Sequence, residues 1–233
     1  IINNTNIPIY IILNKEYAAL DKKLEWIKEI KPLKCFTVHH DFHTFEKITN
    51  IPFFRISWSA EHSIFKDYKE EYKNDLFFSG VIRTEQTKNL RYKIYKNLNK
   101  LKNLRINFNA NILGITNNMI MYDNITYAKE LAKSKIGLIT TGPADLVGTR
   151  YFEIMAGNRC LILCNRMNEK IYNNIVIDNF NCIMFDDEND FVEKCKYYLN
   201  NEEERIKIVN QAYKYFLEKH TWNHKVNNLI ENL

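Results

Sequence analysis

Short apolar runs rich in Ile, Val and Phe alternate along the chain with segments of helical period. This alternation is typical of βαβ units, in which helices connect parallel strands. We predict strands at 7–13, 34–39, 53–57, 75–81, 105–109, 136–140, 160–164 and 182–185. We predict helices at 16–30, 44–49, 87–102, 126–133, 149–156 and 188–199, followed by two terminal helices at 202–219 and 222–233. The pattern therefore predicts an α/β fold with a parallel sheet.

The alternation stops at residues 65–74, where Lys, Asp, Tyr and Glu follow one another without a period. About three predicted strands precede this break and about five follow it. We therefore expect a small or truncated N-terminal α/β domain at 1–68. A second, complete α/β domain is expected at 69–233.

Composition excludes several classes of protein. With 233 residues, 45% of them hydrophobic, the chain can bury a core and is neither a disordered tail nor a disulfide-stapled miniprotein. No apolar run approaches the roughly 20 residues that a membrane span needs. The five cysteines are odd in number, which predicts free thiols and a reducing, cytoplasmic location. Four of them lie in strongly apolar runs: Cys35, Cys160, Cys164 and Cys182.

The net charge of +5 comes from an excess of cations in the middle third of the chain. Residues 76–150 contain 12 Lys and Arg against 4 Asp and Glu, an excess of +8. Such a field suits an anionic ligand such as a phosphate ester, whereas a nucleic-acid surface would interleave the charge with exposed aromatic rings. Seven of these cations lie within residues 88–105, which also fits a solvated helix face.

Two loops after predicted strands carry residues suited to a phosphate. In the first, Gly80 lets backbone amides approach an anion before a helix begins, and Arg83 supplies a guanidinium fork. A lone glycine at such a turn is also common for purely structural reasons.

The second loop concentrates three of the six glycines of the chain, Gly142, Gly148 and Gly157. Gly148 and Thr149 offer free amides at a helix start, and Arg150 adds a cation. Glu153 can accept hydrogen bonds from two hydroxyls, so that phosphate and diol together match a nucleotide sugar. Structural interpretations remain: Glu153 complements the helix N-terminus, and Gly157 ends the helix.

Three runs, at 127–139, 150–162 and 180–187, resemble the donor-binding half of GT-B glycosyltransferases, of the "glycosyl transferases group 1" type that includes the CgeB-like proteins. The likeness covers about residues 60–233 and centres on Arg-x-Phe-Glu-x-Met-Ala-Gly. It implies a GT-B-like fold, in which a Rossmann-type domain at 69–233 sends its terminal helices back to the short first domain. In this family two acidic residues flank seven others. The resemblance implies that Glu153 binds the donor ribose and that Asp145, shorter than the usual Glu, faces the transferred sugar. It also implies that the Gly148 amide contacts the diphosphate or sugar, and leaves Arg83 and Arg91 as candidate diphosphate partners.

The run Cys35-Phe-Thr-Val-His-His-Asp-Phe-His43 resembles the strand that ends in His-Asp at the interdomain cleft of these enzymes. This implies a catalytic role for His40 and acceptor-side contacts for His39, Asp41 and His43. The same residues could form a metal site, although adjacent residues on a strand point to opposite faces and structural zinc wants a second ligand cluster. Ordinary surface or hydrogen-bonded histidines are the third interpretation.

The resemblance implies a metal-independent, retaining glycosyltransferase without a cofactor. Its donor would be a UDP-, GDP- or dTDP-sugar, and its acceptor a glycan, protein or lipid. The departing nucleoside diphosphate would be stabilised by helix amides and basic side chains. Two alternatives stay open: a non-catalytic GT-B-like binding module of a longer multidomain chain, and a nucleic-acid-binding surface in the basic middle third.

Overall fold

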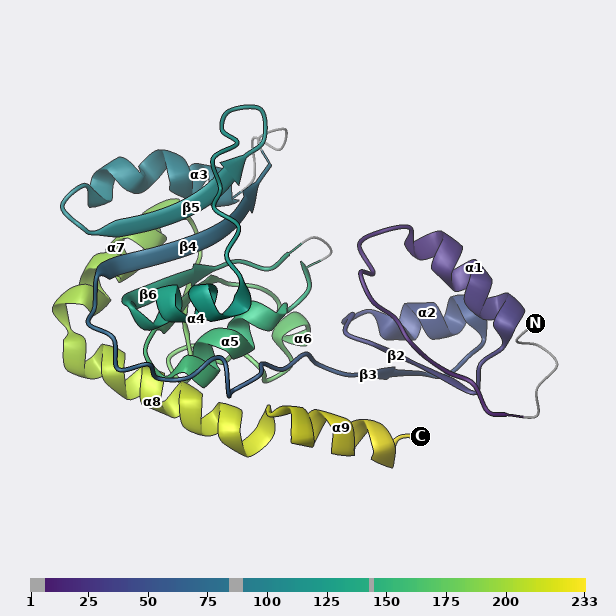
Figure 1. Cartoon of the computed structure of the whole chain (residues 1–233). Coiled ribbons are helices and arrows are strands. Elements are labelled where there is room, and N and C mark those ends of the chain that lie inside the picture. Colours follow the sequence, from purple (N-terminus) through teal and green to yellow (C-terminus); the bar gives the residue numbers. More distant parts are fainter. Residues whose placement is uncertain (1–6, 84–89, 143–144) are drawn as a thin grey trace.

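The computed structural model describes residues 7–83, 90–142 and 145–233, which form two parallel sheets joined by an extended segment (Figure 1). The first sheet has the order β1-β2-β3, with β1 (Tyr10–Ile12), β2 (Lys34–Thr37) and β3 (Phe53–Arg55). The second has the order β5-β4-β6-β7-β8, with β4 (Asn74–Ile82), β5 (Ile106–Ile112), β6 (Ser134–Ile139), β7 (Leu161–Asn165) and β8 (Ile183–Phe185). The eight predicted strands are all present and the parallel α/β fold is confirmed.

Helices pack against both sheets. The first sheet carries α1 (Leu20–Ile30) and α2 (Phe42–Thr49). The second is surrounded by α3 (Leu90–Asn97), α4 (Asn124–Ala132), α5 (Thr149–Gly157), α6 (Glu169–Tyr172), α7 (Glu188–Asn200) and α8 (Glu202–Lys219). The long helix predicted at 87–102 consists of α3 and a 3₁₀ turn at Leu98–Leu101, and its first three residues lie outside the described part of the chain. The short helix α6 was not predicted.

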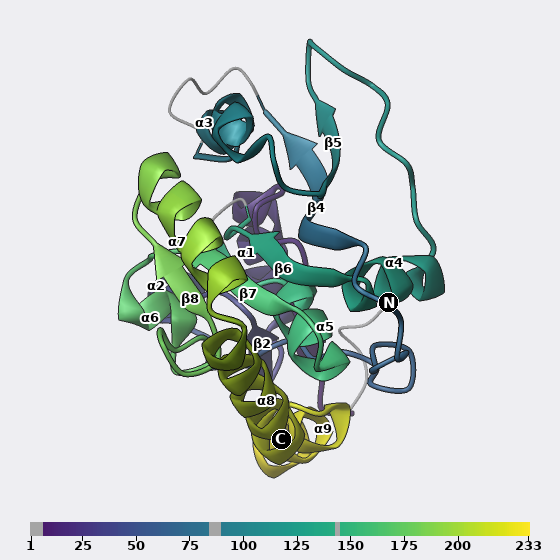
Figure 2. The ribbon, with the colours of Figure 1, turned by 90° about the vertical axis from the view of Figure 1, so that its left-hand side faces the viewer.

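The five-stranded sheet is buried on both faces. Leu161 and Leu163 of β7 pack towards α3 and α7, whereas Ile162 and Cys164 pack towards α4 and α5. Figure 2 shows these two helix layers on opposite sides of the sheet. Because successive side chains of a strand point to opposite faces, a strand covered on both sides is apolar at every position. The continuous apolar runs of the sequence have this cause. All five cysteines are free and buried.

The first helix begins four residues later than predicted. Glu16 is buried, and its carboxylate accepts hydrogen bonds from Thr37 Oγ1 at 2.6 Å and the Val38 amide at 3.2 Å. Lys15 and Ala19 adopt positive φ angles on either side of it. The backbone turns here, the Glu16 carboxylate accepts the hydrogen bonds offered at the end of β2, and α1 therefore begins only at Leu20.

The last two helices run back along the molecule. After α8, α9 (Trp222–Glu231) lies beside the first sheet (Figure 1), where Tyr10 Oη donates to the Leu233 carbonyl at 3.0 Å. Ser59, in the segment between the sheets, donates to the His220 carbonyl at 2.5 Å. The two sheets lie on either side of residue 68, and a domain boundary there stays a prediction. Within the described ranges no helix is both long and apolar enough to span a membrane.

Candidate functional site

A cavity of about 500 Å³ opens at the carboxyl ends of β4, β6 and β7. Ligands of open parallel sheets bind at this end of the strands. Three of the predicted site residues line the cavity, Arg83, Gly142 and Asp145, and so does Arg91. Thr140, Thr141 and Asn165 complete its polar wall.

Arg91, on α3, ties two strand ends together at this cavity. Its guanidinium donates to the Val81 carbonyl at 3.1 Å and to the Thr140 carbonyl at 3.2 Å, and its Nε donates to Thr140 Oγ1. Burial lowers the pKa of Arg91, and the nearby cation of Arg150 lowers it further. Both causes disfavour the charged guanidinium, so an anion in the cavity would relieve them.

Asp145 is held in a tight turn at the edge of the cavity. Its amide donates to the Gly142 carbonyl at 3.1 Å, and its carboxylate accepts a long hydrogen bond from Thr141 Oγ1 at 3.4 Å. Its φ of 52° lies in the left-handed region, which is uncommon for residues other than glycine. Backbone strain of this kind concentrates at functional sites, where it aims a side chain.

The start of α5 lies next to this turn. Gly148 is its N-cap in an extended conformation, and no side chain caps the helix. Helix amides without a cap are available to an anion.

Arg150, the second residue of α5, is already engaged in hydrogen bonding. It donates to the Ser79 carbonyl and lies over the Tyr127 ring at 5.8 Å. A Cβ added to Gly80 would come within 3.0 Å of Arg150 Nη1. Gly80 therefore makes room for this arginine, a packing role that the sequence did not reveal.

Glu153 faces a different part of the domain. It lines a nearly filled cavity of about 10 Å³ together with Phe65 and Ala128, and does not line the larger cavity. Burial raises its pKa, opposed by a hydrogen bond with Thr149 and by Arg150. A role for Glu153 in ribose binding stays a prediction.

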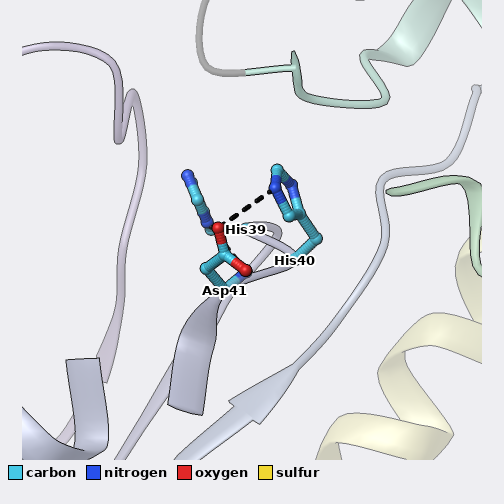
Figure 3. Close-up of side chains that lie close together, drawn as sticks. All are labelled: His39, His40 and Asp41. Carbon is cyan, nitrogen blue, oxygen red and sulfur yellow. Dashed lines mark hydrogen bonds and ion pairs between the residues drawn. The ribbon is translucent and has the colours of Figure 1, made fainter. Parts of the chain in front are cut away.

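His39, His40 and Asp41 follow β2 directly and lie together at its carboxyl end (Figure 3). His40 Nε2 is 3.3 Å from Asp41 Oδ2, and the Asp41 amide donates to His39 Nδ1 at 3.0 Å. The two imidazole rings stack with centroids 4.6 Å apart. Burial lowers the pKa of both histidines, so both are neutral near pH 7.

Charges from the second sheet reach this cluster. Asp145 acts with Asp41 to raise the pKa of His40 against the effect of burial, whereas Arg55 and Lys170 lower it. The fold thus brings the two predicted catalytic residues, His40 and Asp145, into electrostatic contact although 105 positions separate them in the sequence (145 − 40).

The same cluster is the one group of potential metal ligands within the described residues, with ligand atoms inside 4.8 Å of one another. Lys170 Nζ lies 3.1 Å from Asp41 Oδ1, however, and Arg55 adds a second cation nearby. His43 takes no part, because it is exposed on α2 and pairs with Glu46 at 2.7 Å. The donor set and its cations suit hydrogen bonding to a substrate better than a metal ion.

Sequence reasoning did not find Lys170 and Arg55. Arg55 donates from Nη1 and Nη2 to the Lys170 and Ile171 carbonyls, at 2.6 Å each. The only local signal for α6 is Asn168, whose side chain caps it, and four helical residues are too few to show a period.

The structure thus combines two parallel sheets, a cavity lined by two arginines at the strand ends of the larger sheet, and a His-Asp cluster at the carboxyl end of the smaller one. The model of the family described as "glycosyl transferase-like" matches residues 90–231, more than half of the chain. The chain therefore belongs to the glycosyl transferase-like family, whose class of activity is sugar transfer. A search of curated protein sequences found no match.

Solved structures agree in fold. HepE from Anabaena, in complex with UDP-glucose, is similar over 97% of this chain and 72% of its own, at 9% identity and a TM-score of 0.64. TarM from S. aureus is similar over 98% and 51%, at 17% identity and a TM-score of 0.70. Sucrose-phosphate synthase from Thermosynechococcus elongatus is similar over 94% and 62%, at 8% identity and a TM-score of 0.60. The chain thus spans about half to three quarters of their lengths.

Proposed function

We propose that this protein transfers a sugar from a nucleoside diphosphate sugar that binds in the cavity at the carboxyl ends of β4, β6 and β7. The observation that carries the proposal is the wall of this cavity, in which Arg83 and Arg91 stand together with Asp145. Two guanidinium groups suit a diphosphate, because charge-assisted hydrogen bonds from arginine to phosphate are strong. HepE has been solved with UDP-glucose and with UDP, which favours a uridine donor.

The transfer step follows from these groups. The bond from the sugar to the diphosphate breaks with the electron pair leaving on a phosphate oxygen, and Arg83, Arg91 and the uncapped amides of α5 stabilise that charge. The anomeric carbon forms its new bond to the acceptor hydroxyl oxygen, and the hydroxyl proton passes to the departing phosphate. Asp145 faces the sugar, and neutral His40 contacts it from the first sheet. We propose that the reaction is retaining and needs no metal ion.

The acceptor enters from the side of β2, where His39 and Asp41 flank His40. A glycan, protein or lipid hydroxyl is the proposed acceptor. We assign Glu153 and Gly148 to the nucleotide on the family motif alone, since neither residue lines the cavity. The five buried thiols support a reducing compartment, and we propose the cytoplasm.

A thermal shift assay with UDP, GDP and dTDP tests donor binding. At about 100 times its Kd, a ligand stabilises a protein by about 2.7 kcal/mol, which for a chain of this size raises Tm by roughly 5–10 °C. We expect this shift with UDP, and an affinity about tenfold weaker in Arg83→Gln because a charge-assisted contact is lost. Lys102→Gln, which removes an exposed cation elsewhere, is the matched control. No shift with any of the three nucleotides would refute the proposal.

Release of nucleoside diphosphate from the donor tests catalysis. Asp145→Asn should slow this release about 100-fold while UDP binding persists, because it removes charge at the transferred sugar. Binding without release or transfer by the unaltered protein would favour the alternative of a non-catalytic binding module. The observation that favours this alternative is Asp145, whose side chain is shorter than the Glu usual in the family.

A further inference from the structure

Lys170 connects the two halves of the proposed active site. Its Nζ lies 3.1 Å from Asp41 Oδ1, and the other oxygen of the same carboxylate lies 3.3 Å from His40 Nε2. Resting on the function proposed above, we propose that Lys170 is a positioning residue that acts through Asp41 to hold His40 in its working orientation and tautomer. Neither the family motif nor the sequence pattern pointed to this lysine.

The Asp41 side chain contacts Lys170 and His40 and does not cap the helix α2. It occupies the N-cap position of α2, where an aspartate side chain usually accepts hydrogen bonds from the first amides of the helix. Here its side chain caps nothing and instead bridges Lys170 and His40. The Asp41 carboxylate is thus available to Lys170 and His40 because it is not used as a helix cap.

The carboxylate also favours one tautomer of His40. Asp41 Oδ2 lies 3.3 Å from His40 Nε2, so its negative charge favours a proton on Nε2 over one on Nδ1. Nδ1 then keeps its lone pair, and this nitrogen is buried with no hydrogen-bond partner among the described residues. A buried acceptor without a donor is costly, and a sugar hydroxyl would satisfy it.

The backbone of Lys170 is held independently of its side chain. Arg55 donates two hydrogen bonds, at 2.6 Å each, to the Lys170 and Ile171 carbonyls and so joins the end of β3 to α6. Removing the ammonium group should therefore leave this contact between the sheets in place. The Lys170 and Asp41 side chains are 59% and 47% exposed, and ion pairs this open contribute little to stability.

Among the described residues, four charged side chains act on the pKa of His40 together with its burial. Burial, Arg55 and Lys170 lower this pKa, whereas Asp41 and Asp145 raise it. Without the lysine, Asp41 is no longer neutralised and one opposing cation is gone. Both changes raise the pKa of His40.

The test compares Lys170→Met with Lys170→Arg and with Lys214→Met, which removes a distant exposed ion pair on α8. We expect Lys170→Met to slow nucleoside diphosphate release about tenfold with less than a twofold change in donor KM. The His40 titration, followed by NMR, and the acid limb of the pH–rate profile should both move to higher pH. Lys170→Arg should restore most of the rate, and Lys214→Met should behave as the unaltered protein.

Unchanged release and an unmoved His40 titration in Lys170→Met, with UDP still bound, would overturn the positioning role and leave the proposed function standing. If the unaltered protein neither binds UDP nor releases diphosphate, the proposed function fails instead. The His40 titration then still decides whether Lys170 acts on His40, because NMR requires no turnover.

Discussion

The two sheets of this molecule differ in the number of buried apolar residues that pack against them. The five-stranded sheet lies between two clusters of 23 and 18 buried apolar residues, whereas the three-stranded sheet has one cluster of six. Several large apolar side chains of the smaller region stay exposed, among them Ile7, Ile12, Trp26, Leu33 and Ile48. Burial of apolar surface drives folding, so the larger region can hold its shape alone and the smaller one cannot do so as well.

The smaller region compensates through contacts with its neighbour. Arg55 joins it to α6, Lys170 pairs with Asp41, and Tyr10 reaches the end of α9. The His-Asp cluster therefore lies in the smaller and less stable region, and its position depends on contacts with the larger region. The following predictions address this difference in decreasing order of expected effect.

Truncation of a core side chain in the larger region should destabilise both regions, whereas truncation in the smaller region should destabilise only that region. Leu163→Ala in the fully buried β7 should cost about 2–5 kcal/mol and weaken both regions, since the smaller one depends on the larger. Phe45→Ala on α2 should cost about 3–5 kcal/mol but open only the smaller region, leaving UDP binding intact. Hydrogen exchange by mass spectrometry, with a UDP thermal shift, separates the two results. Simultaneous opening of both sheets in Phe45→Ala would contradict the comparison.

Acid should weaken the junction between the regions. His220, at the end of α8, is 6% exposed, and burial lowers its pKa to about 3, helped by the cations of Lys225 and Lys219. Because the folded-state pKa lies below the usual value near 6.5, the folded protein binds fewer protons than the unfolded chain. The stability it contributes is complete above about pH 6.5 and falls by about 3 kcal/mol by pH 4, at about 1.4 kcal/mol per pH unit.

Urea titrations between pH 7 and pH 4 measure this loss. His220→Asn keeps an acceptor for the Lys225 ammonium, which lies 2.9 Å from His220 Nδ1, but cannot take up a proton. We expect it to flatten most of the dependence, the rest coming from His39 and His40, whose pKa values burial lowers in the same direction. An equally steep dependence in His220→Asn would remove His220 as the cause.

The smallest expected effect concerns the contact between β1 and the end of α9. Tyr10→Phe deletes the hydrogen bond to the Leu233 carbonyl, which is exposed, so the loss should be about 0.5–1 kcal/mol. Amide exchange should rise in β1 and α9 and stay unchanged in β6 and β7. Faster exchange in β6 would mean that the larger sheet also depends on this contact.

Much of the fold could be predicted from the sequence, because a parallel strand that is buried on both faces is a continuous apolar run. The runs around Phe77, Leu138 and Leu163 predicted their strands, and the glycine-rich loop predicted the turn that holds Asp145. Helix ends were less accessible where a distant partner decides them. Glu16 continues the helical pattern of the sequence, yet it leaves the helix to bond with Thr37.

The site divides in the same way. The sequence named Arg83, Asp145 and the His-Asp pair as candidates from their residue types and positions, and the structure places the first two at the cavity and the pair at the end of β2. The contacts of Gly80 and Lys170 could not be predicted in this way. Gly80 is small because Arg150, 70 positions away (150 − 80), needs the space, and Lys170 meets Asp41 from a helix too short to show a period.

The sequence by itself determined two parallel α/β units, the position of the strands and the chemistry available at their ends. These depend on local periodicity and on residue type, which neighbouring residues suffice to express. Only the tertiary structure decided which charges meet. Packing of the two sheets against α6 and α9 sets the distances among Lys170, Asp41 and His40, and electrostatic interactions depend on distance and burial, which no local pattern encodes.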